Sequence, residues 1–527
     1  MKIQIKGIVQ GVGFRPFIYN LACTNNLKGH VTNTSEGVWV ELEGPSDALD
    51  AFHRAIIDEK PPLVKITDMR IVEQPVRWYP DFTIRKSLVE EHRRTLISPD
   101  VCVCERCLQE LFDPDDRRFG YPFINCTNCG PRYTIITDIP YDRPFTAMRE
   151  FEMCVLCEAE YHDPANRRFH AQPNACWDCG PVMRLWNHAG QAISAEDPIA
   201  EARSLLKQGN IVAIKGLGGF HLAVDASNNG AVMRLRQRKH REEKPLALMA
   251  FSIPDITRFA RLTHAEASLL NAPQRPVVLV EKQPNLCIAE QVAPRNRNYG
   301  VMLPYTPLHY LLLHGKDHLV LVMTSGNISE EPIAVDNQEA FERLHGIADY
   351  FLNHDRAIYL RSDDSVVRVV AGGVTRQIRR SRGYVPEPIF LDRSLEPILA
   401  CGGELKNTIC LTRGNEAFLS QHIGDLENLE TLNFFEMTIQ HLRRILEIKP
   451  KIVAHDLHPD YLSTHYALKQ RSTVQIGVQH HHAHIVSGMA EHGLAGAVIG
   501  VALDGTGYGT DGQIWGGEVL IAEDRLF

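Results

Sequence analysis

The sequence contains no long apolar run. Its most apolar pieces are short, such as residues 319–323, whereas about 18 consecutive apolar residues are needed to span a bilayer. Residues 1–6 alternate between apolar and polar side chains, as a strand does, and they lack the apolar core of a signal peptide. We therefore expect a soluble, cytoplasmic protein that neither crosses nor binds a membrane.

An excess of positive charge is also missing. The 56 Lys and Arg residues face 64 Asp and Glu residues, which gives a formal net charge of −8. This balance excludes the overall basic character of a general nucleic-acid binder, although a local basic face remains possible. The apolar content of 44% excludes a largely disordered chain, and 527 residues at roughly 150 per domain predict three or four domains.

A disulfide framework is typical of exported proteins with an even number of cysteines. This sequence shows no export signal, and its 13 cysteines are an odd number, so a disulfide framework is not expected. Eight of them form four Cys-x-x-Cys pairs, which are Cys104/Cys107, Cys126/Cys129, Cys154/Cys157 and Cys176/Cys179. The second half of this block repeats the first after 50 residues, since 154 − 104 = 50 and 179 − 129 = 50. The Arg-Arg-Phe sequence at 117–119 recurs in the same register at 167–169. A repeat of this kind indicates a duplicated structural unit.

Zinc suits this pattern, because two Cys-x-x-Cys turns supply the four thiolates of a tetrahedral site. We expect a duplicated zinc-finger domain over residues 100–183 with two structural zinc ions. The sequence leaves open whether each half binds its own ion or the halves exchange pairs. Closed four-cysteine sites offer no position for catalysis, so the expected role is a scaffold; free thiols or redox pairs are the alternative.

The first ninety residues alternate between strands and helices. Strands are expected at 3–9 and 38–43 and helices at 16–25 and 47–58, with a glycine-containing loop at 10–15 that can cradle an anion. The sequence GIVQGVGFR at 7–15 resembles the acylphosphatase signature. The resemblance implies a ferredoxin-like α+β domain over residues 1–92, in which Arg15 holds an acyl phosphate and Asn33 orients the attacking water. A binding-only module is the alternative.

The central region predicts a helix at 199–208, a strand at 211–215, a glycine turn at 216–220 and a basic run on a helical stretch that ends at Pro245. A basic run is commonly a solvated helix face, but cations that face glycine loops can bind a triphosphate. The motifs KGLGGFH, RxR…KP, TSGN and SxxR resemble the YrdC family, which joins a carbamoyl group to AMP. This resemblance implies an α/β domain over residues 196–385 that uses ATP with Mg²⁺. The substrate- and nucleotide-binding residues that it implies are Lys215, Arg236, Arg238, Lys244, Ser325, Asn327 and Arg368.

Residues 184–195 are polar and residues 381–393 contain two prolines, so both stretches are expected to be linkers. After the second, a strand enters a glycine turn at 399–407, and a buried strand is expected at 498–503. His480 and His484 lie four residues apart and share one face of a predicted helix that runs to residue 491, which suits two ligands of one zinc or iron ion. The side chains of His481 and His482 point elsewhere on that helix.

This last region resembles the catalytic domain of the threonylcarbamoyl transferases, an actin-like (ASKHA) fold. The resemblance implies that Asp504 joins His480 and His484 at the metal, and that residues 394–527 form only the first part of a two-lobed domain. A C-terminally truncated chain is therefore expected.

The order of the four domains resembles the hydrogenase maturation carbamoyltransferase (HypF) family. The resemblance implies that carbamoyl phosphate and ATP form carbamoyl-adenylate. The carbamoyl group then passes to the C-terminal cysteine of a HypE-type partner, as a precursor of the cyanide ligands of nickel–iron hydrogenase. Two alternatives remain: a carbamoyltransferase that acts on a small molecule or a tRNA, and a non-catalytic zinc-dependent assembly module.

Overall fold

The computed structural model describes residues 1–34, 37–85, 96–284, 288–328 and 331–527. The predicted end of the first domain, at residue 92, lies outside these residues. The chain divides into two compact units between Tyr384 and Val385. No helix in the described part of the chain combines the length and the apolar character that a membrane crossing requires.

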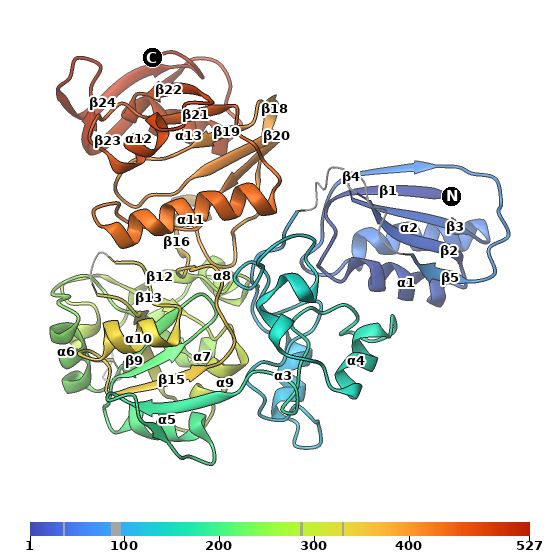
Figure 1. Cartoon of the computed structure of the whole chain (residues 1–527), viewed down its shortest axis with the longest axis horizontal. Helices are drawn as coiled ribbons and strands as arrows, with labels where there is room; N and C mark the ends of the chain where they lie inside the picture. The colour runs from blue at the N-terminus through green and yellow to red at the C-terminus, as the bar shows by residue number, and fades with distance from the viewer. Residues whose placement is uncertain (35–36, 86–95, 285–287, 329–330) are drawn as a thin grey trace. The chain divides into compact units, whose positions relative to one another are not determined.

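The amino-terminal domain is a five-stranded sheet in the order β4-β1-β3-β2-β5, and Figure 1 shows its two helices on one face of that sheet. Its elements are β1 (Lys2–Ile8), α1 (Phe14–Thr24), β2 (Lys28–Thr34), β3 (Gly37–Glu43), α2 (Ser46–Asp58), β4 (Lys65–Val72) and β5 (Phe82–Ile84). Alternate side chains of β1, such as Ile3 and Ile5, are fully buried. The βαββαβ order is that of the predicted ferredoxin-like fold. The sequence prediction missed β2, because its polar start hides the strand pattern.

The cysteine-rich segment contains little regular structure. Helices α3 (Glu105–Phe112) and α4 (Val155–His162) begin and end 50 residues apart, and two short 3₁₀ turns, η1 (Arg143–Phe145) and η2 (Ala147–Glu150), lie between them. Each helix starts directly after the first cysteine of its half. The duplication in the sequence is therefore also a duplication in the structure.

The central domain is built on a mixed sheet of twelve strands. The order is β17-β16-β12-β13-β10-β14-β9-β8-β15-β6-β7, and β11 pairs with β12. The strands are β6 (Met183–Asn187), β7 (Ala192–Ile193), β8 (Val212–Lys215), β9 (Phe220–Asp225), β10 (Ala247–Ala250), β11 (Ala260–Arg261), β12 (Val277–Lys282), β13 (Asn298–Met302), β14 (Val320–Ser325), β15 (Tyr350–His354), β16 (Val366–Val369) and β17 (Thr375–Arg379). The helices are α5 (Pro198–Lys207), α6 (Asn229–Arg238), α7 (Ile253–Ile256), α8 (His264–Asn271), α9 (Pro307–Leu313) and α10 (Asn337–Leu344), with 3₁₀ turns η3 (Glu290–Val292) and η4 (Ala371–Gly373).

The cysteine-rich segment, which we call the finger (residues 100–183), shares one hydrophobic core with the central sheet within the first unit. The Val103 amide donates to the Tyr305 carbonyl at 3.0 Å, and the Tyr359 amide donates to the Thr134 carbonyl at 2.9 Å. The finger therefore packs as a part of the central domain's core.

The expected linker at 184–195 is wrong. Strand β6 pairs antiparallel with β15 from Met183 opposite His354 to Asn187 opposite Tyr350, and β7 extends the edge of the sheet. Met183 and Leu185 are buried whereas Arg184 between them is exposed, which is the alternation of an edge strand. The short length of the strand and the polar turn that follows hid this pattern.

The second unit contains a five-stranded sheet in the order β18-β20-β19-β21-β22, together with the hairpin β23–β24. Its strands are β18 (Ile389–Leu395), β19 (Ile398–Ala400), β20 (Cys410–Leu419), β21 (Ile452–Asp456), β22 (Val474–Val478), β23 (Val498–Tyr508) and β24 (Ile514–Ala522). Its helices are α11 (Leu429–Ile445), α12 (Leu462–Leu468) and α13 (His480–Glu491), the last with the predicted end (Figure 1). Strands β19, β21 and β22 are parallel, so their carboxyl ends point the same way.

The expected linker at 381–393 is also wrong. Ser381 and Arg382 are buried in the first unit, and β18 of the second unit already begins at Ile389. The structure leaves Val385–Pro388 as the only stretch between Tyr384 and β18. Polar and proline residues suggested a solvated linker, but Arg382 is held by partners that lie far away in the sequence.

The strand expected at 498–503 differs in two respects. Strand β23 continues through Asp504 to Tyr508, with a shift of register between Leu503 and Gly507. It is not a buried strand, because Ile499, Val501 and Leu503 are exposed. Their face of the hairpin is not covered by any residue that the structure describes.

Candidate functional sites

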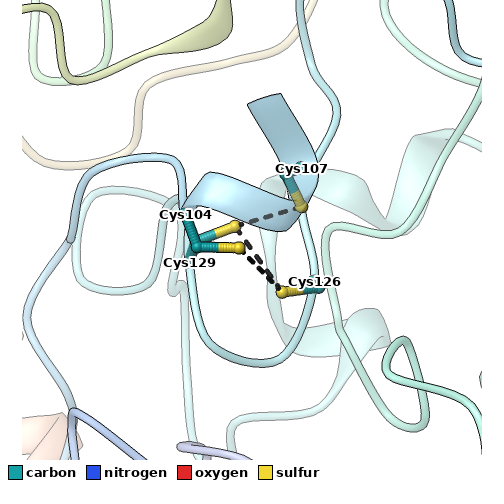
Figure 2. A group of neighbouring side chains, drawn as sticks. All are labelled: Cys104, Cys107, Cys126 and Cys129. Atoms are coloured by element: carbon teal, nitrogen blue, oxygen red, sulfur yellow. Dashed lines mark hydrogen bonds between the residues drawn. The ribbon is translucent and has the colours of Figure 1, made fainter. Parts of the chain in front are cut away.

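The eight cysteines form two clusters, and each cluster belongs to one half of the repeat. In the first, the sulfur of Cys126 lies 3.7 Å from those of Cys104 and Cys129, and the sulfurs of Cys129 and Cys107 are 3.6 Å apart. Figure 2 shows these four side chains converging from α3 and from the following cysteine turn. In a tetrahedral site with Zn–S bonds of about 2.3 Å, the sulfurs lie about 3.8 Å apart. The cluster therefore has the dimensions of a zinc site.

The second cluster repeats this geometry. Sulfur–sulfur distances are 3.7 Å between Cys154 and Cys176, 3.8 Å between Cys176 and Cys179, and 3.6 Å between Cys179 and Cys157. The halves do not exchange Cys-x-x-Cys pairs, which settles the pairing that the sequence left open. The residues fit two structural zinc ions.

The two halves are nevertheless tied together by arginines. Arg117 of the first half donates to the Cys157 sulfur at 3.3 Å and lies 2.8 Å from Glu160, both in the second half. Arg167 of the second half donates to the Cys107 sulfur at 3.2 Å and lies 2.6 Å from Glu110, both in the first half. The buried side chains of Arg118 and Arg168 pair with the same two glutamates in the same crossed manner. Each half therefore supplies cations to the cysteine cluster of the other.

The predicted phosphate loop of the amino-terminal domain lies against the finger. Gly13, with φ of 75°, caps α1, and a Cβ there would lie 2.8 Å from the Asn128 amide oxygen. The Arg132 side chain donates to the Gly11 carbonyl at 3.4 Å. Burial lowers the pKa of Arg15 at the start of α1, although Asp142 and Tyr161 of the finger act in the opposite direction.

Asn33 lies in β2, at the strand end that Gln10 of the loop ties to the hairpin by hydrogen bonds to the Thr34 and Gly37 carbonyls. Its side chain is buried, and its amide oxygen has no hydrogen-bond partner among the described residues. A buried carbonyl without a partner can accept from a water or a ligand. No hydrogen bond joins Asn33 to Arg15 in the structure.

The loop of Ser325 and Asn327 follows β14 and is held by cations that the sequence analysis did not select. The Lys239 ammonium donates to the Ser325 carbonyl at 2.7 Å and to the Asn327 side-chain oxygen at 2.6 Å. Arg241 donates to Thr324 Oγ1 at 3.3 Å. Burial lowers the pKa of Lys239 to about 7, and the nearby Arg241 adds to this shift.

The basic residues selected from the sequence point elsewhere. Helix α6 ends at Arg238, so the run is not one helical stretch. Arg236 is bound to five backbone carbonyls of the following loop and of η3, and Arg238 pairs with Asp349 at 2.7 Å. Lys244 is exposed in the loop after α6, and Arg368 is exposed on β16. Arg236 thus shapes the loop that carries Lys239, Arg241 and Lys244.

Lys215 ends β8 and borders a small cavity of about 30 Å³. Its ammonium donates to the His354 carbonyl at 3.2 Å. Burial lowers the pKa of Lys215 to about 8; Asp336 and Asp355 oppose this shift, and Arg356 adds to it.

A buried ion-pair network stands beside the glycine turn at 216–220. His221 Nε2 lies 3.0 Å from one Asp364 oxygen, and Arg382 donates to the other oxygen at 2.8 Å. The Arg382 guanidinium also lies 3.5 Å from the centre of the Tyr305 ring. Although burial opposes it, the charge of Arg382 holds the pKa of Asp364 well below its ordinary value. His221 thus lies beside the turn and is hydrogen-bonded to Asp364.

In the second unit the structure brings His480, His484 and Asp504 together as one potential metal cluster. His480 Nε2 lies 3.0 Å from Asp504 and 3.2 Å from His484 Nε2, and His484 Nε2 lies 3.8 Å from Asp504. The cluster is formed by the first turn of α13 and by β23. Nitrogen and carboxylate donors on three sides fit a zinc or iron ion.

His480 has a further partner that the sequence analysis did not identify. Asp456, the last residue of β21, lies 2.6 Å from His480 Nδ1 and directs Nε2 toward Asp504. The hydrogen bond to Asp456 raises the pKa of His480. The sequence signal that could have identified Asp456 was an aspartate at the carboxyl end of a parallel strand. His482 binds the Glu523 carbonyl at 2.8 Å, away from the cluster, as expected. The Nε2 atom of the buried His481 lies 3.9 Å from Asp504, so this side chain faces the cluster, unlike the expectation.

Family models match each of these regions in turn. An acylphosphatase model matches residues 1–84, and a HypF finger model matches residues 103–136 and 153–186. The Sua5–YciO–YrdC model, described as Telomere recombination, matches residues 204–381. A HypF Kae1-like domain matches residues 393–491, and the second subdomain of a carbamoyltransferase Kae1-like domain matches residues 500–527. All four predicted fold types are confirmed.

Similar proteins match along almost the whole chain. Carbamoyltransferase HypF2 of Cupriavidus necator is 50% identical over 99% of this chain and 67% of its own length. Carbamoyltransferase HypF of a Synechocystis species is 49% identical over 98% of this chain and 67% of its own length. A crystal structure of full-length HypF in the phosphate- and nucleotide-bound form matches with a TM-score of 0.92 and 49% identity, covering 99% of this chain and 68% of that chain. This chain thus spans about two thirds of the length of these relatives, and it belongs to the HypF family of carbamoyltransferases.

Proposed function

We propose that the chain carries out the carbamoyl-transfer steps of nickel–iron hydrogenase maturation. Carbamoyl phosphate and water give carbamate and phosphate, and carbamate then attacks the α-phosphate of ATP. A carbamate O–P bond forms, the bond to pyrophosphate breaks, and carbamoyl-adenylate results. The thiolate of the C-terminal cysteine of a HypE-type acceptor displaces AMP and becomes a thiocarboxamide, the precursor of a cyanide ligand.

The first step is assigned to the amino-terminal domain. The guanidinium of Arg15 suits a phosphate dianion because its donors match two oxygens at once. The unpartnered amide oxygen of Asn33 is available to accept from the attacking water. A neutral amide holds water in place without titrating. The match of the acylphosphatase model to residues 1–84 supports this assignment.

The second step is assigned to the central domain. Lys239 and Arg241 hold the loop of Ser325 and Asn327. This loop is proposed to bind the ATP phosphates together with the exposed Lys244, and Mg²⁺ is proposed to accompany ATP. Adenylation consists mainly of orienting the carbamate oxygen and neutralising the pyrophosphate, which cationic side chains achieve without a catalytic carboxylate. Arg236 and Arg238 are positioning residues in this proposal, and Arg368 keeps the least support, because it is exposed on β16.

The third step is assigned to the second unit. His480, His484 and Asp504 would hold an iron or zinc ion, and Asp456 would orient His480. Such an ion supplies positive charge beside a bound nucleotide when it is present. We propose four domains over residues 1–92, 100–183, 196–385 and 394–527, with β6 and β7 joined to the third and the start of β18 to the fourth.

The observation that carries the proposal is that the finger contacts both the phosphate loop of the amino-terminal domain and the cavity beside Lys215. Arg132 reaches the Gly11 carbonyl of the phosphate loop, and its neighbours Gly130 and Pro131 line the cavity that Lys215 borders. Carbamate decomposes in water, so a short protected path between the first and second sites has a chemical purpose. An added reagent that traps carbamate should then compete poorly with carbamoyl transfer.

The test is ATP–pyrophosphate exchange driven by carbamoyl phosphate in the full chain. The Arg15→Ala variant should lose about 100-fold of this exchange, in the range of a lost transition-state contact, and added ammonium carbamate should restore it. The Lys215→Ala variant should lose exchange with either donor. If Lys215→Ala exchanged normally, or if carbamate failed to rescue Arg15→Ala, the assignment of the two steps would be wrong.

A further inference from the structure

The cavity beside Lys215 is walled by two parts of the first unit. The finger contributes Val103 and Phe123 to its lining, and the central domain contributes Lys215, Tyr305 and Arg356. Most of this lining is apolar. The backbone hydrogen bond from Val103 to Tyr305 closes one side of the cavity. The charged groups in its wall are therefore conspicuous.

Arg356 is the most unusual group in this wall. It is only 6% exposed, its Nε atom has no hydrogen-bond partner among the described residues, and no ion pair within 4.0 Å joins it to them, although the charges of Asp100 and Asp355 act on it from farther away. The described partner is the ring of Phe123, whose centre lies 5.1 Å from the guanidinium carbon. Burying a cation without hydrogen-bond partners is costly, and a cation–π contact offsets only a part of that cost. The guanidinium is thus placed to bind an anion that enters the cavity.

Lys215 lies in the same wall and is also a buried cation without an ion-pair partner among the described residues. It is 3% exposed. One N–H of its ammonium group donates to the His354 carbonyl, and the other two N–H groups can donate to a ligand. Two buried cations that border one apolar cavity repel each other, and a shared anion converts that repulsion into attraction.

We propose that Lys215 and Arg356 form a binding site for a small carboxylate-type oxyanion, such as carbamate or bicarbonate, and that Phe123 of the finger completes the site. A planar carboxylate matches the two parallel donors of a guanidinium. The mostly apolar lining strengthens the attraction between the two cations and a bound anion. The finger then forms part of a ligand site in addition to its structural role. The identification of the ligand as carbamate rests on the proposed function, whereas the binding of a carboxylate-type anion does not.

Binding can be measured without ATP or carbamoyl phosphate, by isothermal titration of the full chain with bicarbonate in a sealed cell at pH 7. Hydrogen bonds to a charged group predict that Arg356→Gln weakens bicarbonate about 10- to 100-fold. Arg184→Gln removes the same charge from an exposed position on β6 and should leave the affinity unchanged. Inorganic phosphate is titrated in parallel. Unchanged bicarbonate affinity in Arg356→Gln, or a loss confined to phosphate, would overturn the proposal.

Arg356→Lys keeps the charge and most of the buried stem, and it covers the case in which Arg356→Gln does not fold. Loss of the guanidinium fork should still weaken bicarbonate about tenfold, while Mg-ATP binding, measured on the same sample, stays within twofold. Equal weakening of ATP would make Arg356 part of the nucleotide site and would overturn the proposal, as would unchanged bicarbonate affinity. If the wild-type chain binds bicarbonate but shows no carbamate-dependent exchange, the proposed function fails and the anion site stands.

Discussion

Burial without a counter-ion gives Lys215 a property that a surface lysine lacks. Its pKa is about 8, because desolvation penalises the ammonium form more than Asp336 and Asp355 stabilise it, and the charge of Arg356 adds to the penalty. The folded-state pKa is lower than the ordinary value of a lysine, so the cation is present below about pH 8 and is lost as the pH rises through that value. An anion bound beside it would favour the ammonium form again.

We therefore expect bicarbonate to bind more weakly as the pH rises through 8, with uptake of protons on binding near pH 8.5. Titration in buffers of different ionisation enthalpy measures that uptake directly. Lys215→Arg should abolish the uptake, because arginine stays protonated throughout this range. Proton uptake that is unchanged in this variant would assign the titration to another group.

The residue scale also shows the limit of motif transfer. The sequence places six basic residues within eleven positions, 234–244, and periodicity does not reveal which of them face the Ser325 loop. The answer depends on where α6 ends. The helix stops at Arg238, and therefore the side chains of Lys239 and Arg241 point toward the Ser325 loop. The Arg236 side chain instead donates to backbone carbonyls of the loop that follows the helix. A helix end is set by tertiary contacts such as the pairing of Arg238 with Asp349, which no local pattern contains.

At the scale of elements, the crossed arginines give the 50-residue repeat a physical meaning. Each Arg-Arg-Phe turn neutralises the glutamate and a cysteine sulfur of the other half, so a four-thiolate zinc site with its net negative charge is stabilised from across the repeat. The repeat was visible in the sequence, and so were the cysteine sets. The crossed contacts of the arginines were not visible, because a repeat in the sequence does not show whether a side chain contacts its own half or the other half.

Each arginine should consequently protect the cysteine cluster of the half to which it does not belong. Arg117→Gln should speed alkylation of Cys154, Cys157, Cys176 and Cys179 about tenfold, in line with a lost hydrogen bond to a charged sulfur. Arg167→Gln should do the same for Cys104, Cys107, Cys126 and Cys129. Mass spectrometry of the alkylated peptides, with zinc release followed by a chromogenic chelator, resolves the two clusters.

Arg149→Gln provides the matched control for this test, because Arg149 is an exposed arginine of the same finger that pairs only at the surface with Glu150. It should change neither cluster. Increased reactivity in the half that carries the substitution, or in both halves equally, would show that the crossed hydrogen bonds do not govern metal retention.

Other elements show which parts of the fold a sequence discloses. Strands with strong alternation and helices with clear starts were predicted within a few residues, as for α2, α5 and α13. Residues 184–187 and 389–393 were assigned to linkers, because short or edge strands with polar neighbours carry too few alternating positions. Asp456 was missed for a different reason: its role depends on the parallel pairing of β21 with β22, which is followed by α13 and His480.

At the scale of the whole molecule, the proposed chemistry divides between the two units. The phosphate loop, the finger and the anion cavity lie in the first unit, whereas the cluster of His480, His484 and Asp504 lies in the second. Each unit has its own sheets and its own buried residues. A ligand that binds only the folded form of one unit should stabilise that unit by mass action and leave the other unaffected.

Calorimetry of the full chain should accordingly show separate transitions for the two units. Cobalt(II), a probe for nitrogen and carboxylate sites, should raise the transition of residues 385–527 by roughly 5–10 °C at about 100 times its Kd, since this corresponds to about 2.7 kcal/mol. Mg-ATP should raise the transition of the first unit, which contains the proposed ATP loop. Asp504→Asn should remove the cobalt shift and keep the ATP shift. One transition that both ligands move together would mean that the units unfold as a single cooperative body, because mass action then acts on both at once.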